Sequence, residues 1–183
     1  MIKIGRIFLI FFISVSIYAQ KKQGQELIDS LQTVVANKIE GSQKADLYNA
    51  LFIACIKKDI STAANYAQLQ LELSTRIKYN DGIALAKRNL GIVSTTHTDF
   101  DAAIQSYKSA LTCTNNKKIR GQIFGSLGKV YFLKSDYPSS LENYNKSLTL
   151  FEDLNEIELQ KSVLQSISSL YISIGDSEKA REF

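Results

Sequence analysis

The sequence predicts an all-α fold, an α-solenoid of helix–turn–helix repeats preceded by a signal peptide. Three observations support this prediction. A sequence pattern recurs four times, with spacings of 40, 37 and 40 residues, and such a period is typical of repeat architectures. Apolar residues within each copy recur at helical spacing. A short apolar run preceded by two positive charges begins the chain.

Residues 1–19 have the layout of a secretory signal peptide. Lys3 and Arg6 precede the apolar run, and Ala19 supplies the small residue expected just before a cleavage point. The run is shorter than the roughly 20 residues that span a bilayer. Ile17 is bulkier than the residue usual at its position, so an uncleaved membrane anchor stays open as the alternative. We expect contact with a membrane only through this segment.

Charge and composition exclude some classes of function. Apolar residues make up 45% of the chain, enough to form a packed core. The net charge of +4 falls to +2 when Lys3 and Arg6 leave with the signal peptide. A nearly neutral chain has no basic surface for nucleic acid, so no nucleic-acid partner is expected.

One amphipathic helix over residues 22–39 is predicted before the repeats. Its inward positions are Leu27, Leu31, Val34, Val35 and Ile39. Because the end of a solenoid needs a cap with a polar outer face, residues 20–42 are interpreted as a capping segment. Gln25, Asp29, Gln32 and Lys38 supply the polar face.

Two copies of the repeat, residues 90–111 and 127–148, align without a gap. Each begins with Leu-Gly, reaches an Asp followed by an aromatic residue, and continues to a Tyr and a Leu. Weaker copies flank these two. The corresponding positions of the four copies are Leu51, Gly91, Gly128 and Ser168.

Each copy is predicted to form two helices. In the third copy, apolar residues recur at helical spacing on both sides of a break at residues 134–136, and Pro138 stands where a helix can begin. Small residues fall where the two helices should cross, which lets their backbones approach closely. The facing pairs are Gly91 with Ala103 and Gly128 with Ser140.

This pattern resembles the tetratricopeptide repeat. The residues that carry the resemblance best are Leu127, Gly128, Tyr131, Ser140, Tyr144 and Ser147. The second copy departs from the family pattern at Ser94, and the first departs at Ala54 and Ala67. The resemblance covers residues 43–183 and implies a right-handed solenoid of about 3.5 repeats, the last one incomplete.

The resemblance also implies a binding groove, because the first helices of the pairs line the concave side of such a solenoid. We expect a protein or peptide ligand there, although several of these residues could instead pack between repeats. The positions that match the family's groove are Tyr48, Phe52, Arg88, Ile92, Thr95, Gly125, Lys129, Phe132, Gln165 and Ser169.

Some family members hold a C-terminal carboxylate with lysines, asparagines and an arginine. Asn89 matches one position of that clamp, whereas the other positions carry Tyr48, Phe52, Gln122 and Ser126. The clamp activity is therefore not expected here.

The fourth copy stops at Phe183, inside its second helix. We expect the apolar residues of its first helix to lack part of their cover. These residues are Ile167, Leu170, Tyr171 and Ile174. Three interpretations stay open: a chain that continues in the natural protein, a truncated copy, or self-association through this open end.

The sequence predicts no catalytic, metal or cofactor site. His97 is the only histidine, too few for the clustered ligands of zinc. Residues 121–129 fail as a phosphate loop because Ile123 replaces a required glycine and Val130 replaces Ser or Thr. The two cysteines, at positions 55 and 113, are interpreted as free side chains packed in helices, with a disulfide as the alternative.

These observations predict a protein-interaction module rather than an enzyme, exported to the periplasm or cell envelope of a bacterium. Residues 27–31 and 47–51 resemble the exported sensor regions of bacterial signalling proteins. The alternative is a structural assembly or scaffold factor of an envelope complex.

Overall fold

The computed structural model describes residues 25–36 and 39–183. Within those ranges the protein forms nine helices and no β-strand, which confirms the all-α prediction. The predicted signal peptide, residues 1–19, lies outside them. The helices are α2 (Gln25–Ala36), α3 (Gly41–Cys55), α4 (Ile60–Arg76), α5 (Asn80–Thr96), α6 (Phe100–Leu111), α7 (Lys117–Leu133), α8 (Tyr137–Asp153), α9 (Ile157–Ser173) and α10 (Ser177–Ala180).

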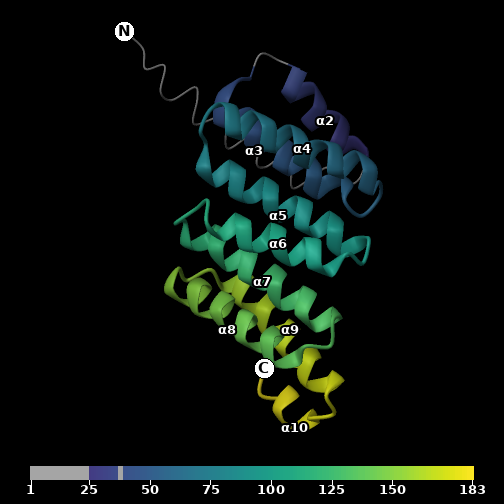
Figure 1. The fold of residues 1–183 in the computed structure, drawn as a ribbon, viewed down its shortest axis with the longest axis vertical. Helices are drawn as coiled ribbons and strands as arrows, with labels where there is room; N and C mark the ends of the chain where they lie inside the picture. Colours follow the sequence, from purple (N-terminus) through teal and green to yellow (C-terminus); the bar gives the residue numbers. More distant parts are fainter. Residues whose placement is uncertain (1–24, 37–38) are drawn as a thin grey trace.

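The helices pack successively in chain order, from α2 at one end of the molecule to α10 at the other (Figure 1). The closest partners are α3 with α4, α5 with α6, and α7 with α8. Helix α4 also packs on α5, α6 on α7, and α8 on α9. The odd-numbered helices touch one another as well, α3 with α5, α5 with α7, and α7 with α9. The arrangement is therefore repeat-like, and the odd-numbered helices form one continuous layer.

One kind of turn follows five of the helices. The residue after the helix C-cap has a φ between 54° and 83° in each case, and the next N–H donates to the carbonyl five residues back. After α7, for example, Asp136 N donates to Tyr131 O at 2.9 Å. The Asp136 carboxylate then accepts from Ser139 N and caps α8. The break predicted at residues 134–136 is this turn. The five residues of positive φ are Lys78, Thr98, Ser135, Asn155 and Gly175.

Small residues let the paired helices cross closely, as predicted. Ser140 is fully buried, and its Oγ donates to the Gly128 carbonyl at 2.8 Å. The ring of Tyr144 lies directly over Gly128: a Cβ there would be 2.5 Å from Tyr144 Cδ1. Gly91 lies under Tyr107 in the same way, with a Cβ position 2.5 Å from Tyr107 Cε1.

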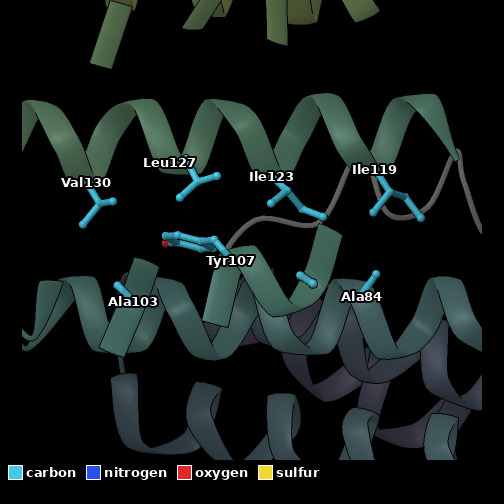
Figure 2. Close-up of a cluster of buried hydrophobic side chains, with 8 residues drawn as sticks. Ala84, Ala103, Tyr107, Ile119, Ile123, Leu127 and Val130 are labelled. Carbon is cyan, nitrogen blue, oxygen red and sulfur yellow. The ribbon is translucent and has the colours of Figure 1, made fainter. Parts of the chain in front are cut away.

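The central core lies between α5 and α7. Figure 2 shows the ring of Tyr107 from α6 lying between these helices, with Ile123 and Leu127 of α7 pointing toward it. Ala84 of α5 and Ala103 of α6 complete this layer, and both are fully buried. Small alanine side chains on one side therefore face large aliphatic and aromatic side chains on the other.

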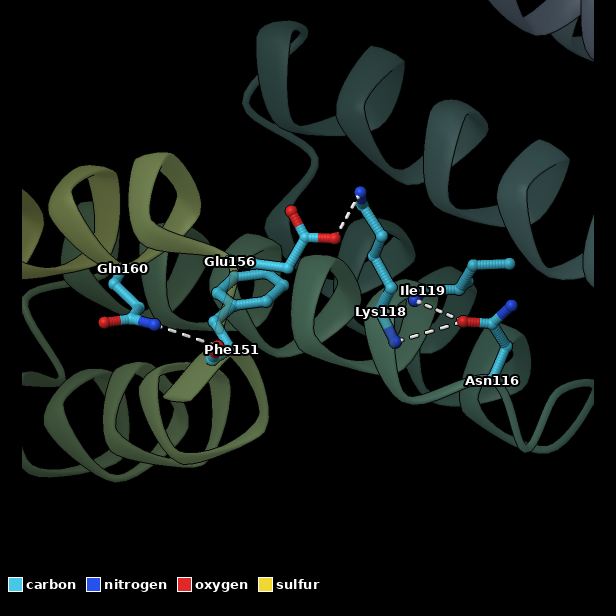
Figure 3. Close-up of polar contacts among 6 residues, drawn as sticks. All are labelled: Asn116, Lys118, Ile119, Phe151, Glu156 and Gln160. Atoms are coloured by element: carbon cyan, nitrogen blue, oxygen red, sulfur yellow. Dashed lines mark hydrogen bonds and ion pairs between the residues drawn. The ribbon is translucent and has the colours of Figure 1, made fainter. Parts of the chain in front are cut away.

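Polar contacts tie α7 to the α8–α9 connection. Figure 3 shows Lys118 Nζ donating to Glu156 Oε1 at 2.6 Å, and the Asn116 side chain capping the first turn of α7. Gln160 Nε2 donates to the Phe151 carbonyl at 3.0 Å, which satisfies the end of α8. Exposed ion pairs add little stability, so we interpret these contacts as fixing orientation.

Helix α2 covers residues 25–36 of the predicted helix, and residues 22–24, 37 and 38 lie outside the described ranges. It packs on α3, with Ile28 and Leu31 buried, whereas Ile39 is not helical. Gln32 Nε2 donates to Tyr66 Oη at 2.7 Å.

The first helix of the last pair is better covered than the sequence predicted. Ile167 and Leu170 are buried, with 0% and 1% of their surface exposed, so the expectation that they lack cover is wrong. They share one core cluster with Tyr144 and Phe151 of α8, while short helix α10 packs on α9 and Ser168 Oγ donates to the Ala180 carbonyl at 2.8 Å. Ile174 is exposed. None of the described helices is long and apolar enough to cross a bilayer.

Candidate binding site between α5, α7 and α9

A cavity of about 410 Å³ lies where α5, α7 and α9 come together. Residues of α6 and α8 form part of its lining. Half of the ten predicted groove residues line this one cavity. They are Arg88, Ile92 and Thr95 of α5, with Gly125 and Lys129 of α7.

The lining divides into apolar and polar parts. Ile92, Phe151, Leu159 and Val163 supply apolar surface, and hydroxyl groups from all five lining helices supply polar surface. The lining hydroxyl residues include Thr95, Thr96, Ser126, Ser162 and Ser166. A mainly apolar cavity with a few polar groups is typical of ligand sites.

Tyr107 lines the cavity from α6. Its hydroxyl forms a hydrogen bond of 3.1 Å with Thr95 Oγ1. Burial raises the pKa of Tyr107, and the bond to Thr95 lowers it less. The phenol therefore stays protonated at neutral pH and adds no negative charge.

Arg88 is the charged group of the α5 wall. Its Nε donates to Ser126 Oγ at 3.1 Å and to the Gln122 carbonyl at 3.3 Å. Burial lowers the pKa of Arg88, and Tyr107 raises it by a smaller amount. An arginine still keeps its proton in a protein, so a full positive charge faces the cavity.

The other five predicted groove residues lie elsewhere. Tyr48 stacks on Tyr66 with ring centroids 6.3 Å apart, near the α2 end of the molecule. Phe52 has 1% of its surface exposed and belongs to the core with Leu51 and Ala63. Its side chain is enclosed by residues of α2, α3 and α4 in this cluster, with α5 residues packed against it, and so offers no surface to a ligand.

Near the α9 end, Phe132 packs against Tyr137 with ring centroids 6.0 Å apart. Gln165 and Ser169 are exposed on α9 and do not line the cavity. The α9 residues that do line it were missed by the sequence analysis. They are Leu159, Ser162, Val163 and Ser166.

The missed residues follow from which edge of each helix faces the cavity. Helix α5 presents the edge that faces the following pair, and α9 presents the edge that faces the preceding pair. Ser166 corresponds in the repeat to Asn89 of α5, which is fully buried and bonds backward to Asn49 and Gln70. The sequence analysis used the same repeat positions as groove residues in every helix. Those positions identify the α5 wall of the cavity but not the α9 wall. The Asn89 position, carried forward to α9, would have identified Ser166.

A larger cavity, of about 520 Å³, lies on α7 and α8, but its charges are already partnered. Arg120 Nη1 donates to the carbonyls of Leu111 and Thr114. Lys146 Nζ pairs with Glu142 Oε1 at 2.5 Å. The protein itself therefore satisfies the charged groups of this second cavity.

Other sites considered from the sequence lie in ordinary structural positions. Residues 121–129 lie within α7, and His97 is the exposed C-cap of α5. Cys55 and Cys113 are free thiols. No group of three or more histidine, cysteine or acidic side chains suited to a metal ion occurs in the part of the chain that the structure describes.

No protein-family model matches the sequence, and no curated protein matches it. Among solved structures, the chain is similar to the crystal structure of BtubC (BKLC) from P. vanneervenii, with a TM-score of 0.66 and 16% sequence identity. The match covers 86% of this chain and 69% of that chain. At this identity the likeness concerns the fold alone.

Proposed function

We propose that the chain is a tetratricopeptide-type, right-handed solenoid that binds a peptide segment of a partner protein between α5, α7 and α9. The observation that carries the proposal is the convergence of Arg88, Ile92, Thr95, Gly125 and Lys129 on one cavity. The repeated turns and the continuous layer of odd-numbered helices support the assignment of the repeat type.

The chemistry of the lining suits a peptide. Apolar surface from Ile92 and Val163 can take an aliphatic anchor, whose burial is worth about 1.5–3 kcal/mol. Hydroxyls and cations around it can bond to the carbonyls of an extended backbone. Gly125 adds no side chain to the lining, so the cavity is not narrowed at this point of α7.

Selection from a library of random 12-residue peptides on the purified full chain tests this proposal. We expect enriched peptides whose affinity falls at least tenfold in Ser162→Trp, because Ser162 is an exposed residue of the lining and an indole would occupy the cavity. Gln105→Trp, at an exposed position of α6, is the matched control and should bind as the wild type does. Fluorescence anisotropy of labelled peptides measures both affinities.

Two results would count against the binding function. One is the absence of any enriched peptide. The other is a set of peptides that bind Ser162→Trp as tightly as the wild-type chain, since their site would then lie outside the cavity.

We also propose that residues 1–19 direct export to a bacterial cell envelope, with cleavage after Ala19. Expression in a bacterium, followed by fractionation and N-terminal sequencing, should find a periplasmic chain that begins at Gln20. A chain that keeps Met1 and stays in the cytoplasm would refute export, whereas one retained uncleaved in the membrane would support the anchor alternative.

A further inference from the structure

Arg88 is a partly buried cation without a counter-ion in the fold. None of the ion pairs formed among the described residues includes it. Its hydrogen bonds use Nε alone, to Ser126 and Gln122, and neither terminal nitrogen has an acceptor within residues 25–36 and 39–183. By contrast, Arg120 donates two bonds from a terminal nitrogen, and Lys146 has Glu142.

The cavity around Arg88 is positively charged. Lys129 of α7 also lines it and takes part in none of the ion pairs of the described chain. No Asp or Glu belongs to the lining, and Tyr107 stays neutral. Ser162 adds an exposed hydroxyl that can donate to an anion, whereas the hydroxyls of Ser126 and Ser166 donate to the carbonyls of Gln122 and Ser162.

Arg88 is only partly buried, and its terminal nitrogens are not among the buried polar atoms that lack a partner, so they are open to the cavity where a ligand can pair with them. Here the geometry leaves the pairing to a ligand. The Nε of Arg88 is held by Ser126, so the planar guanidinium is oriented before a ligand arrives. The two terminal nitrogens form a fork that matches the two oxygens of a carboxylate.

We propose that Arg88, assisted by Lys129, binds the side-chain carboxylate of an Asp or Glu in the partner peptide. This inference rests on the proposed function, because it assigns the specificity of the same cavity. We assign a side-chain carboxylate rather than a chain terminus because five successive helices, α5 to α9, line the cavity, so residues on both sides of the carboxylate have lining to contact. The apolar surface of Ile92 and Val163 then receives a neighbouring apolar side chain.

A small probe tests the anion site without any selected peptide. N-acetylglutamate α-amide is titrated into the full chain while NMR follows the backbone amide of Gly125, which lines the cavity. We expect a saturating shift with a Kd on the order of 1 mM, and no shift with N-acetylglutamine amide, its neutral isostere. An equal response to the two compounds would overturn the proposal.

Three variants assign the response to residues. Arg88→Gln should weaken probe binding at least fivefold, and Lys129→Gln about threefold, in a chain whose urea midpoint shows that it is folded. Lys108→Gln removes one charge from an exposed position of α6 and should bind the probe as the wild type does. Because Lys129 is exposed, its variant keeps the test decisive even if Arg88→Gln unfolds. Unchanged binding in Lys129→Gln and in any folded Arg88→Gln would overturn the site.

Further probes identify the source of the anion. N-acetylalanine carries only a terminal carboxylate, and inorganic phosphate carries none; tighter binding of either would overturn the side-chain assignment. If the glutamate probe binds at Arg88 but the library yields no peptide, the proposed function fails and the anion site stands. If peptides are selected but bind Arg88→Gln with undiminished affinity and no preference for an acidic residue, the anion site fails and the function stands.

Discussion

Phe52→Ala should lower the free energy of unfolding by about 3–5 kcal/mol, the range for deleting a fully buried aromatic side chain. Phe52 has 1% of its surface exposed and packs in one core cluster with Leu51, Cys55 and Ala67. Removing the ring leaves a cavity within this cluster that the surrounding helices can fill only in part. Urea denaturation of the full chain, followed by circular dichroism, measures the loss.

Tyr48→Ala is the matched control on the same helix. Tyr48 is only partly buried and stacks on Tyr66, so its loss should cost less than half as much. A Phe52→Ala chain with wild-type stability and reduced peptide affinity would indicate that Phe52 contacts the ligand. That result would contradict the assignment of Phe52 to the core.

Gly128→Leu should cost about 2–3 kcal/mol, at the upper end of the usual cost of overpacking a core. A Cβ at Gly128 would lie 2.5 Å from Cδ1 of Tyr144, whose ring is 5% exposed and cannot move outward freely. The added side chain would push α8 away from α7 and strain the bond from Ser140 Oγ to the Gly128 carbonyl. The urea midpoint should fall, with an early loss of helical signal.

Gly125→Ala, one turn earlier on α7, is the control for this substitution. Its Cβ would meet only Ser147 Oγ, at 3.3 Å. Alanine also gains about 0.5–1 kcal/mol over glycine inside a helix, so the stability should change by less than 1 kcal/mol. A Gly128→Leu chain with the helicity and urea midpoint of the wild type would contradict the close crossing of α7 and α8 at Gly128.

The helices and their crossings could be predicted because local residues determine them. Asp136 caps α8 through Ser139 N, three residues away, and the turn before it closes within six residues. Ser140 meets Gly128 because the repeat keeps their separation constant. The groups that form the cap, the turn and the crossing all lie within a short stretch of sequence, so a sequence pattern can predict them.

The walls of the cavity could be predicted only in part, because they depend on how whole helices are rotated against their neighbours. Arg88 and Gly125 line the cavity as expected, but α9 turns Ser162 and Ser166 toward it instead of Gln165 and Ser169. Helix α9 borders the cavity from the opposite side to α5. The edge of a helix that faces the cavity depends on the position of that helix along the array. A repeat pattern is the same for every copy, so it does not predict this edge.

The account depends most on the claim that ligands bind between α5, α7 and α9. The most direct test is an NMR map of backbone amide shifts when a selected peptide is added to the full chain. We predict that the largest shifts occur at Ile92, Gly125 and Ser162, which line this cavity from three helices. Largest shifts at Asn145 and Thr149, in the cavity on α7 and α8, with Gly125 unchanged, would contradict the account.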